Sequence, residues 1–293
     1  MKRGIIFGGF IVALSTLTGF GQSRYTARES ETIHRTLEFS ATANRMVELD
    51  NINGSIHVTG TNGRSIEIIA AKSIEAVSPE RLAVAKHEVS LDITDRAETV
   101  RIYVNGPERS HRDERGDDWR SSRNRWSDSG YSVKFDFEVQ VPQGTKLRLR
   151  TINGSEIKVD NTQGDFEIEN VNGKITMTDI RGSGSAHTVN GPARVSFLEN
   201  PKSASSFKSV NGAIEVSFQP DLAAKLQMKT INGGLFTDFD VKALASPSAV
   251  GERVGSRFVL RSNQFSGFQV GNGGPEIKFD GFNGSVKVLR RTR

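Results

Sequence analysis

The dipeptide Asn-Gly recurs through most of this 293-residue chain, in most cases after an aliphatic or aromatic residue. The recurring pairs are Asn53-Gly54, Asn153-Gly154, Asn172-Gly173, Asn190-Gly191, Asn211-Gly212, Asn232-Gly233 and Asn283-Gly284. From Asn153 to Asn232 the differences between successive residue numbers are 19, 18, 21 and 21. A fixed period of about 20 residues is typical of repeat proteins in which each unit stacks on the one before it.

Between these turns, apolar and polar residues alternate. The apolar positions are Leu147, Leu149, Ile157, Val159, Phe166, Ile168, Ile175, Met177, Val195, Phe197, Ile214, Val216, Phe218, Ile277, Phe279, Val286 and Val288. A period of two with many β-branched residues predicts strands that turn one side inward. The polar positions between them suit a sheet whose other side meets solvent.

Two all-β folds fit this pattern. Asn-Gly is the strongest short signal for an antiparallel hairpin, because both residues tolerate positive φ, so an antiparallel sandwich is one alternative. The other is a stack of β-coils of about 20 residues, which would bring the Asn-Gly turns together along one edge. There the Asn side chains can hydrogen-bond along the stack, and we favour this fold. In both, the Asn-Gly pairs are structural turns.

The N-terminal half contains the same kind of alternating strands and Asn-Gly turns, interrupted by other segments. The segment that begins at Asn51 parallels the one that begins at Thr151, turn for turn. Between them we expect a short helix over residues 79–88, with Ser78 as N-cap, and a flexible, charge-rich loop over residues 107–130. We therefore divide the chain into a leader, 1–21, a β-rich part, 22–142, and the repeats, 143–293, the last two forming a continuous body.

The first 21 residues predict a secretory signal peptide. Lys2 and Arg3 form a basic start, an apolar run extends from Ile5 to Phe20, and small residues follow. An uncleaved anchor is the alternative, but glycines and hydroxyl residues interrupt the run. No later segment is apolar enough to span a membrane, so we expect a mature protein that is secreted, periplasmic or envelope-associated. It contains no cysteine, so packing must stabilise it without disulfides.

The charge balance argues against nucleic-acid binding. The formal net charge is +5, from 39 basic and 34 acidic residues. Five of the basic residues lie at the two ends of the chain, at Lys2, Arg3, Arg290, Arg291 and Arg293. Everything from residue 4 to residue 289 is formally neutral, so the balance implies no basic face for nucleic acid.

The order VQVPQGTKLRLRTINGSEIKV, residues 139–159, joins an alternating strand, a Val-Pro-x-Gly turn and the Asn-Gly repeats. In this it resembles the bacterial putative adhesin family, a domain of unknown function similar to adhesin head domains with Gly-Ile-Asn repeats. The resemblance covers residues 45–290. It implies a right-handed β-solenoid outside the cytoplasm and an interaction with the surface or envelope, and it implies no catalytic residues.

Candidate chemical sites are weak. Carboxylates that could serve a glycan-cleaving enzyme are Asp160, Asp165, Glu167, Asp238 and Asp240, but basic residues are interleaved with them. The five histidines are scattered without ligand-like spacing. We therefore expect no catalytic residue, no metal and no cofactor, and we keep a carbohydrate-active enzyme on the same scaffold as the alternative.

The charge-rich loop is the candidate binding site. It contains both tryptophans of the chain among several arginines, and these are the residue types most enriched at binding hot spots. The candidate binding residues are Trp119, Arg120, Arg123, Arg125 and Trp126. We expect an adhesin-like protein, not an enzyme, that binds an envelope glycan or a protein through its loops and exposed sheet faces. A role in regulating or sensing envelope stress is compatible with this.

Overall fold

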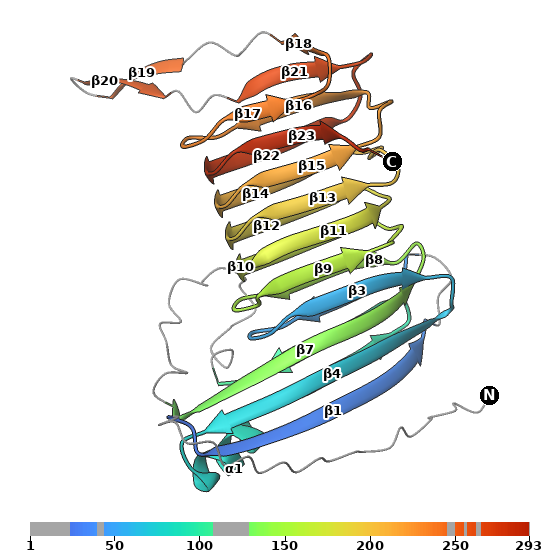
Figure 1. The fold of residues 1–293 in the computed structure, drawn as a ribbon, viewed down its shortest axis with the longest axis vertical. Helices are drawn as coiled ribbons and strands as arrows, with labels where there is room; N and C mark the ends of the chain where they lie inside the picture. The colour runs from blue at the N-terminus through green and yellow to red at the C-terminus, as the bar shows by residue number, and fades with distance from the viewer. Residues whose placement is uncertain are drawn as a thin grey trace. The chain divides into compact units, whose positions relative to one another are not determined.

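The computed structural model describes residues 24–39, 44–107, 129–244, 250–254, 257–261 and 265–292. In this part of the chain the protein is all-β apart from one helix (Figure 1). The chain forms two compact units, Met1–Gly154 and Ser155–Arg293, and each is described by itself below. The boundary between them lies after strand β8, so the strands on either side of residue 142 belong to one unit.

The first unit contains two open sheets. Its strands are β1 (Ala27–Glu38), β2 (Met46–Asp50), β3 (Ile56–Thr61), β4 (Ser65–Ala76), β5 (Ser90–Arg96), β6 (Thr99–Asn105), β7 (Tyr131–Pro142) and β8 (Lys146–Thr151). One sheet has the order β1-β4-β7-β3, and the other has the order β8-β2-β6-β5. Parallel and antiparallel pairs occur in both sheets.

The predicted helix is present as α1 (Pro79–Glu88). Ser78 is its N-cap, and the Ser78 side chain accepts a hydrogen bond from the Arg81 backbone N–H. Proline at the first helical position needs no donor and has a suitable φ, so these residues begin a helix here. Only Ala85 of the helix is buried.

The similarity between the segments at Asn51 and Thr151 is a pairing in space. Strands β2 and β8 lie parallel with Met46 opposite Lys146 and Asp50 opposite Arg150. The same register continues into the turns, where Asn53 forms a parallel bridge with Asn153. Equivalent residues in the two segments therefore face each other directly.

The second unit carries the repeats. Its strands are β9 (Glu156–Asp160), β10 (Phe166–Asn172), β11 (Lys174–Ile180), β12 (Gly184–Asn190), β13 (Ala193–Phe197), β14 (Ser205–Asn211), β15 (Ile214–Phe218), β16 (Ala224–Lys229), β17 (Leu235–Thr237), β18 (Val241–Ala243), β19 (Val250–Val254), β20 (Arg257–Arg261), β21 (Ser266–Val270), β22 (Glu276–Asn283) and β23 (Val286–Arg290). One sheet of this unit has the order β9-β11-β13-β15-β23-β17, and the other β18-β21-β16-β22-β14-β12-β10. Strands β19 and β20 form a separate antiparallel pair.

Each Asn-Gly turn of the repeats joins a strand of one sheet to a strand of the other. The chain passes from β10 to β11 in this way, and again from β12 to β13 and from β14 to β15. Successive strands within a sheet are then parallel, as in the β10–β12–β14 and β11–β13–β15 series. The antiparallel hairpin alternative therefore does not describe these turns.

The order of the strands departs from the order of the sequence at the C-terminus. Strand β22 lies between β14 and β16, and β23 lies between β15 and β17. Figure 1 shows β23, in the dark red of the C-terminus, between the orange strands β15 and β17. The Asn-Gly pair at Asn272 precedes this returning segment, and Asn283 takes its place in the stack of turns.

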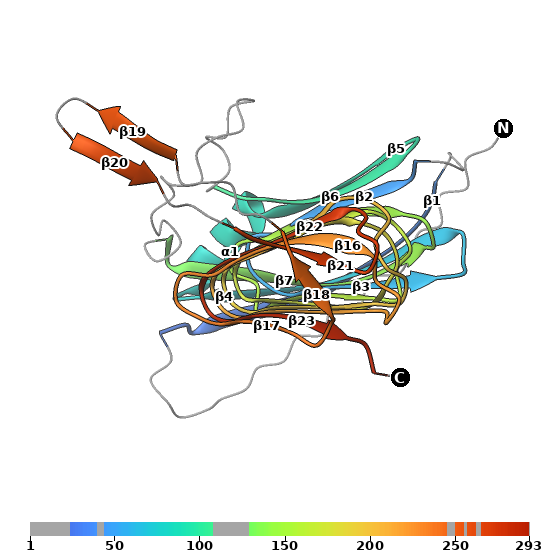
Figure 2. The same cartoon turned by 90° about the horizontal axis from the view of Figure 1, so that it is seen from above.

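The predicted inward residues are the core. All of those listed above are between 0% and 4% exposed. In the second unit the two sheets form separate layers, with β16, β21 and β22 in one and β17 and β23 in the other (Figure 2). The ring of Phe197, on β13, lies edge-on to Phe207 across the layers, with 6.2 Å between the ring centroids. It also stacks on Phe218, with 5.1 Å between the centroids. No helix in the described ranges is long and apolar enough to cross a membrane.

Candidate binding face

Five asparagines of the second unit form a continuous chain of side-chain hydrogen bonds. We call it the asparagine ladder, and its members in spatial order are Asn172, Asn190, Asn211, Asn283 and Asn232. Each amide Nδ2 donates to the Oδ1 of the neighbour, at 2.8 Å in three steps and 2.7 Å in the step from Asn232 to Asn283. These are the hydrogen bonds expected of stacked Asn-Gly turns.

The glycine of each pair allows the turns to approach closely. A Cβ atom on Gly212 would lie 2.1 Å from the Gly191 carbonyl oxygen, and one on Gly191 would lie 2.3 Å from the Gly173 oxygen. A real Cβ atom never lies so near another heavy atom, so only glycine fits between successive Asn-Gly turns. At Gly191 and Gly212 glycine is needed for the spacing of the stack, because neither residue has a positive φ.

A hydroxyl two residues before the asparagine holds the neighbouring turn. Thr188 donates from Oγ1 to the Gly173 carbonyl at 2.8 Å, and Ser209 donates from Oγ to the Gly191 carbonyl at 2.9 Å. Thr230 does the same to the Gly284 carbonyl at 2.7 Å. The sequence-based predictions did not include these residues, of which Thr188 and Ser209 are buried and Thr230 is half-buried. A Thr or Ser at a fixed distance before Asn-Gly is the signal that could have identified them.

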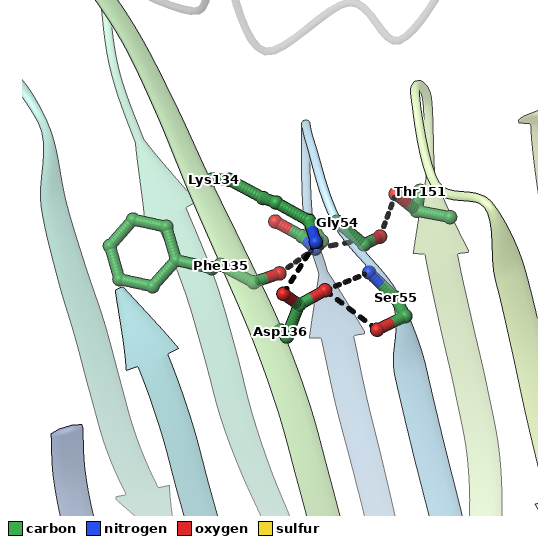
Figure 3. A network of polar contacts seen from close by, with 7 residues as sticks. Gly54, Ser55, Lys134, Phe135, Asp136 and Thr151 are labelled. Carbon is green, nitrogen blue, oxygen red and sulfur yellow. Dashed lines mark hydrogen bonds and ion pairs between the residues drawn. The ribbon is translucent and has the colours of Figure 1, made fainter. Parts of the chain in front are cut away.

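The first unit secures its Asn-Gly turns in a related way (Figure 3). Thr151 Oγ1 donates to the Gly54 carbonyl at 3.3 Å, and Asp136 accepts from the backbone N–H and hydroxyl of Ser55 at 2.8 and 2.6 Å. Lys134 forms an ion pair with Asp136 at 2.7 Å. Burial alone would raise the Asp136 pKa, but the hydrogen bonds from Lys134 and Ser55 outweigh it and lower the pKa.

An apolar stripe runs beside the asparagine ladder. It consists of the residues that directly precede the ladder asparagines, namely Val171, Val189, Val210, Phe282 and Ile231. The three valines are half-buried, whereas Phe282 is 47% exposed and Ile231 is 55% exposed. The stripe is thus most accessible on the strands nearest the C-terminal end of the stack.

Two further columns of outward side chains complete this surface on β10, β12, β14, β22 and β16. The first contains Glu167, Ser185, Ser206, Lys278 and Gln227, and the second contains Glu169, His187, Lys208, Asp280 and Lys229. We call these columns, the apolar stripe and the asparagine ladder together the candidate binding face. Along each of these strands, polar or charged side chains come first, then an apolar residue and then the asparagine.

The charge of the candidate binding face changes from one side to the other. Strand β10 contributes two carboxylates, whereas three lysines come from β14, β22 and β16, with Asp280 between them. The ring of Phe265 lies over this basic side, and its centroid is 4.5 Å from Lys278 Nζ and 5.5 Å from Lys229 Nζ. The basic side thus combines cations with an aromatic surface, an arrangement suited to an anionic polymer.

His187 lies in the middle of the face. One of its ring nitrogens, Nε2, is 3.2 Å from the Ser206 hydroxyl. Burial lowers the His187 pKa below its ordinary value, and Lys208 lowers it further, although Glu169 and Glu167 oppose the shift. The imidazole is therefore neutral at neutral pH.

The candidate binding residues in the loop, Trp119, Arg120, Arg123, Arg125 and Trp126, lie outside the described residues. The signal peptide, 1–21, lies outside them as well. For these segments the sequence-based hypotheses stay predictions.

The carboxylates considered for catalysis have partners at several places, and Asp238 and Asp240 both contact Arg290. Asp160 pairs with Lys158 at 3.0 Å, and Asp165 accepts from the Ser183 backbone at 3.2 Å. Asp240 pairs with Arg290 at 3.1 Å. Among the residues whose positions are described, no group of three or more His, Asp or Glu side chains could hold a metal ion.

No family model matches the chain, and no curated protein matches it. Solved structures similar to it include a putative cell adhesion protein from Clostridium sporogenes, at 11% identity over 90% of this chain and 100% of that chain, with a TM-score of 0.43. A putative adhesin from Bacteroides fragilis is similar at 9% identity over 89% of this chain and 97% of that chain, with a TM-score of 0.30. The candidate binding face is defined by this chain's own side chains.

Proposed function

We propose that this chain is a non-enzymatic envelope protein that binds an extended anionic glycan through the candidate binding face. The repeating part is, in this proposal, a right-handed β-solenoid that serves as a rigid support. The observation that supports it is the register of five adjacent strands, which places equivalent outward side chains in straight columns. Neighbouring strands lie about 4.8 Å apart, so a column offers an extended polymer a regular series of contacts.

The chemistry of the columns suits a glycan. The apolar stripe can pack against the C–H face of a sugar ring, and the asparagine ladder beside it retains hydrogen-bonding capacity for sugar hydroxyls. The lysines of the basic side, Lys208, Lys229 and Lys278, can pair with carboxylate or phosphate groups. Because the polymer makes many weak, repeated contacts with the face, its affinity should increase with its length.

Binding to an acidic polysaccharide tests the proposal. The chain of residues 22–293 should bind an immobilised acidic polysaccharide more tightly than a neutral one, and salt should weaken the contact. The double variant Lys208→Gln with Lys278→Gln should raise the Kd about tenfold, equivalent to about 1.4 kcal/mol. Arg194→Gln is the matched control, because Arg194 is an exposed cation on β13 of the other sheet. Equal Kd values for the double variant and the control would contradict the proposal.

Three alternatives are distinguished by related experiments. If deletion of residues 108–129 abolishes binding while the lysine variants retain it, the site is the tryptophan-containing loop and not the face. If reducing ends appear in the polysaccharide during incubation, the protein is a carbohydrate-active enzyme. A protein partner would be indicated by binding to envelope material from which the glycan has been removed.

A further inference from the structure

The asparagine ladder has one end at which an Asn-Gly pair is incompletely hydrogen-bonded. Asn232 donates from Nδ2 to Asn283 and accepts at its backbone carbonyl from the Gly284 N–H at 2.9 Å. In the part of the chain that the structure describes, no hydrogen bond involves Asn232 Oδ1 or the Gly233 N–H. Asn232 and Gly233 are both exposed.

Asparagines within the ladder differ at the side-chain oxygen and at the N–H of the glycine that follows. Asn211 donates from Nδ2 to Asn190 and accepts at Oδ1 from Asn283. The N–H of the glycine that follows it, Gly212, donates to the Asn283 carbonyl at 2.8 Å. The Gly191 N–H likewise donates to the Asn211 carbonyl at 2.9 Å. Side chain and following peptide are thus both fixed.

This difference matters because an Asn-Gly pair can react with itself. The nitrogen of the glycine peptide attacks the Asn Cγ atom and loses its proton, the new C–N bond closes a five-membered succinimide, and the side-chain amide leaves as ammonia. Water then opens the ring at either carbonyl and gives aspartate or isoaspartate. Glycine favours closure because no Cβ atom obstructs the approach. Closure requires a free glycine nitrogen and an amide that can rotate toward it.

We infer that Asn232 is a site of spontaneous deamidation by water and that the hydrogen bonds of the ladder protect Asn190, Asn211 and Asn283. At the protected positions, closure must first break the bonds of the glycine N–H and the side-chain amide. At Asn232 the side-chain bond to Asn283 must break and the carbonyl still accepts from the Gly284 N–H, but among the described residues the glycine N–H has no hydrogen bond that must break first.

Deamidation would alter the end of the stack. An aspartate at position 232 has no Nδ2 donor, so the hydrogen bond to Asn283 Oδ1 is lost and two oxygens face each other. Isoaspartate adds an atom to the main chain ahead of β17 and disturbs its pairing with β23. The new negative charge appears beside Phe282 and Ile231, and therefore on the basic side of the candidate binding face.

Peptide mapping by mass spectrometry tests the inference on the folded full chain, incubated in mildly alkaline buffer. The rate of conversion at Asn232 should exceed that at Asn190, Asn211 and Asn283 by about tenfold, the factor that corresponds to about 1.4 kcal/mol of lost hydrogen bonding. Asn62-Gly63, in an exposed turn, is the internal reference and should also react. In denaturant all these sites should react at similar rates, because the ladder no longer exists.

A similar rate at Asn232 and Asn211 in the folded protein would overturn the inference. Asn232→Gln is the control variant, since a glutamine closes the larger ring far more slowly while it keeps an amide at the end of the ladder. It should lose the modification at position 232 and leave that at Asn62 unchanged. Conversion at Asn211 should stay low in this variant, because the hydrogen bonds of Asn211 to Asn190 and Asn283 are kept.

Discussion

Inward and outward residues of one strand contribute very differently to stability. Ile175 is fully buried, and its neighbour Lys174 is exposed and forms only a surface ion pair with Glu156 at 3.2 Å. Ile175→Asp should unfold the second unit, because an uncompensated charge would enter the core at a cost of several kcal/mol. Lys174→Ala should cost less than about 1 kcal/mol. Urea unfolding measures both, and similar midpoints for the two variants would show that the assigned core side is wrong.

His187 makes the stability depend on pH. Its pKa is lower in the folded chain than in the unfolded chain because burial disfavours the charged ring. The unfolded chain therefore binds a proton more readily, so stability is complete above the ordinary His pKa and is lost as the pH falls through that value toward the folded pKa. The urea concentration at the unfolding midpoint should therefore decrease as the pH is lowered from about 7.5 to about 5.5.

His187→Gln supplies the control for this pH dependence. The glutamine can still reach the Ser206 hydroxyl, but it does not titrate. The fall in the urea midpoint should be smaller in this variant than in the native chain. An identical fall would assign the pH dependence to other groups.

At the scale of the element, the Asn-Gly turn depends on its glycine because of the neighbouring turn. Gly212→Ala should destabilise the second unit by about 1–3 kcal/mol, the usual cost of overpacking, since the new methyl would lie against the Gly191 carbonyl. Gly63→Ala is the matched control, because Gly63 also follows an asparagine but its nearest neighbour would lie 3.4 Å away. Thermal unfolding compares the two. A Tm for Gly212→Ala equal to that for Gly63→Ala would mean that the stack can expand.

At the scale of the whole molecule, the C-terminal segment is an internal part of the stack. Strands β22 and β23 separate the pair β14 and β15 from the pair β16 and β17. A chain ending at residue 275 should therefore lose the protection of β16, β17 and β21 against hydrogen exchange, whereas β10 to β13 should keep theirs. Stacking in the order of the sequence would instead leave β16 and β17 protected, and hydrogen-exchange mass spectrometry distinguishes the two.

The alternation of residues was enough to predict the strands of the repeats and their core positions, because burial of one side of a strand gives a pattern with a period of two. The helix was predicted from its start at Ser78. The Asn-Gly spacing was likewise enough to predict an amide ladder, since stacking equal units brings equal residues together. The ladder is found in the structure with Asn172, Asn190, Asn211, Asn283 and Asn232 as its members.

The sequence by itself determined which residues face inward and where the turns lie, and it favoured stacked turns over antiparallel hairpins. Only the tertiary structure decided the order of the stack, which places Asn283 before Asn232, and the grouping of His187, Lys208 and Lys278 with Phe265 on one surface. The physical reason is that each repeat offers almost the same row of apolar residues to any neighbouring repeat. The position of each repeat then depends on all of its contacts over the whole sheet. A short stretch of sequence does not reveal these contacts.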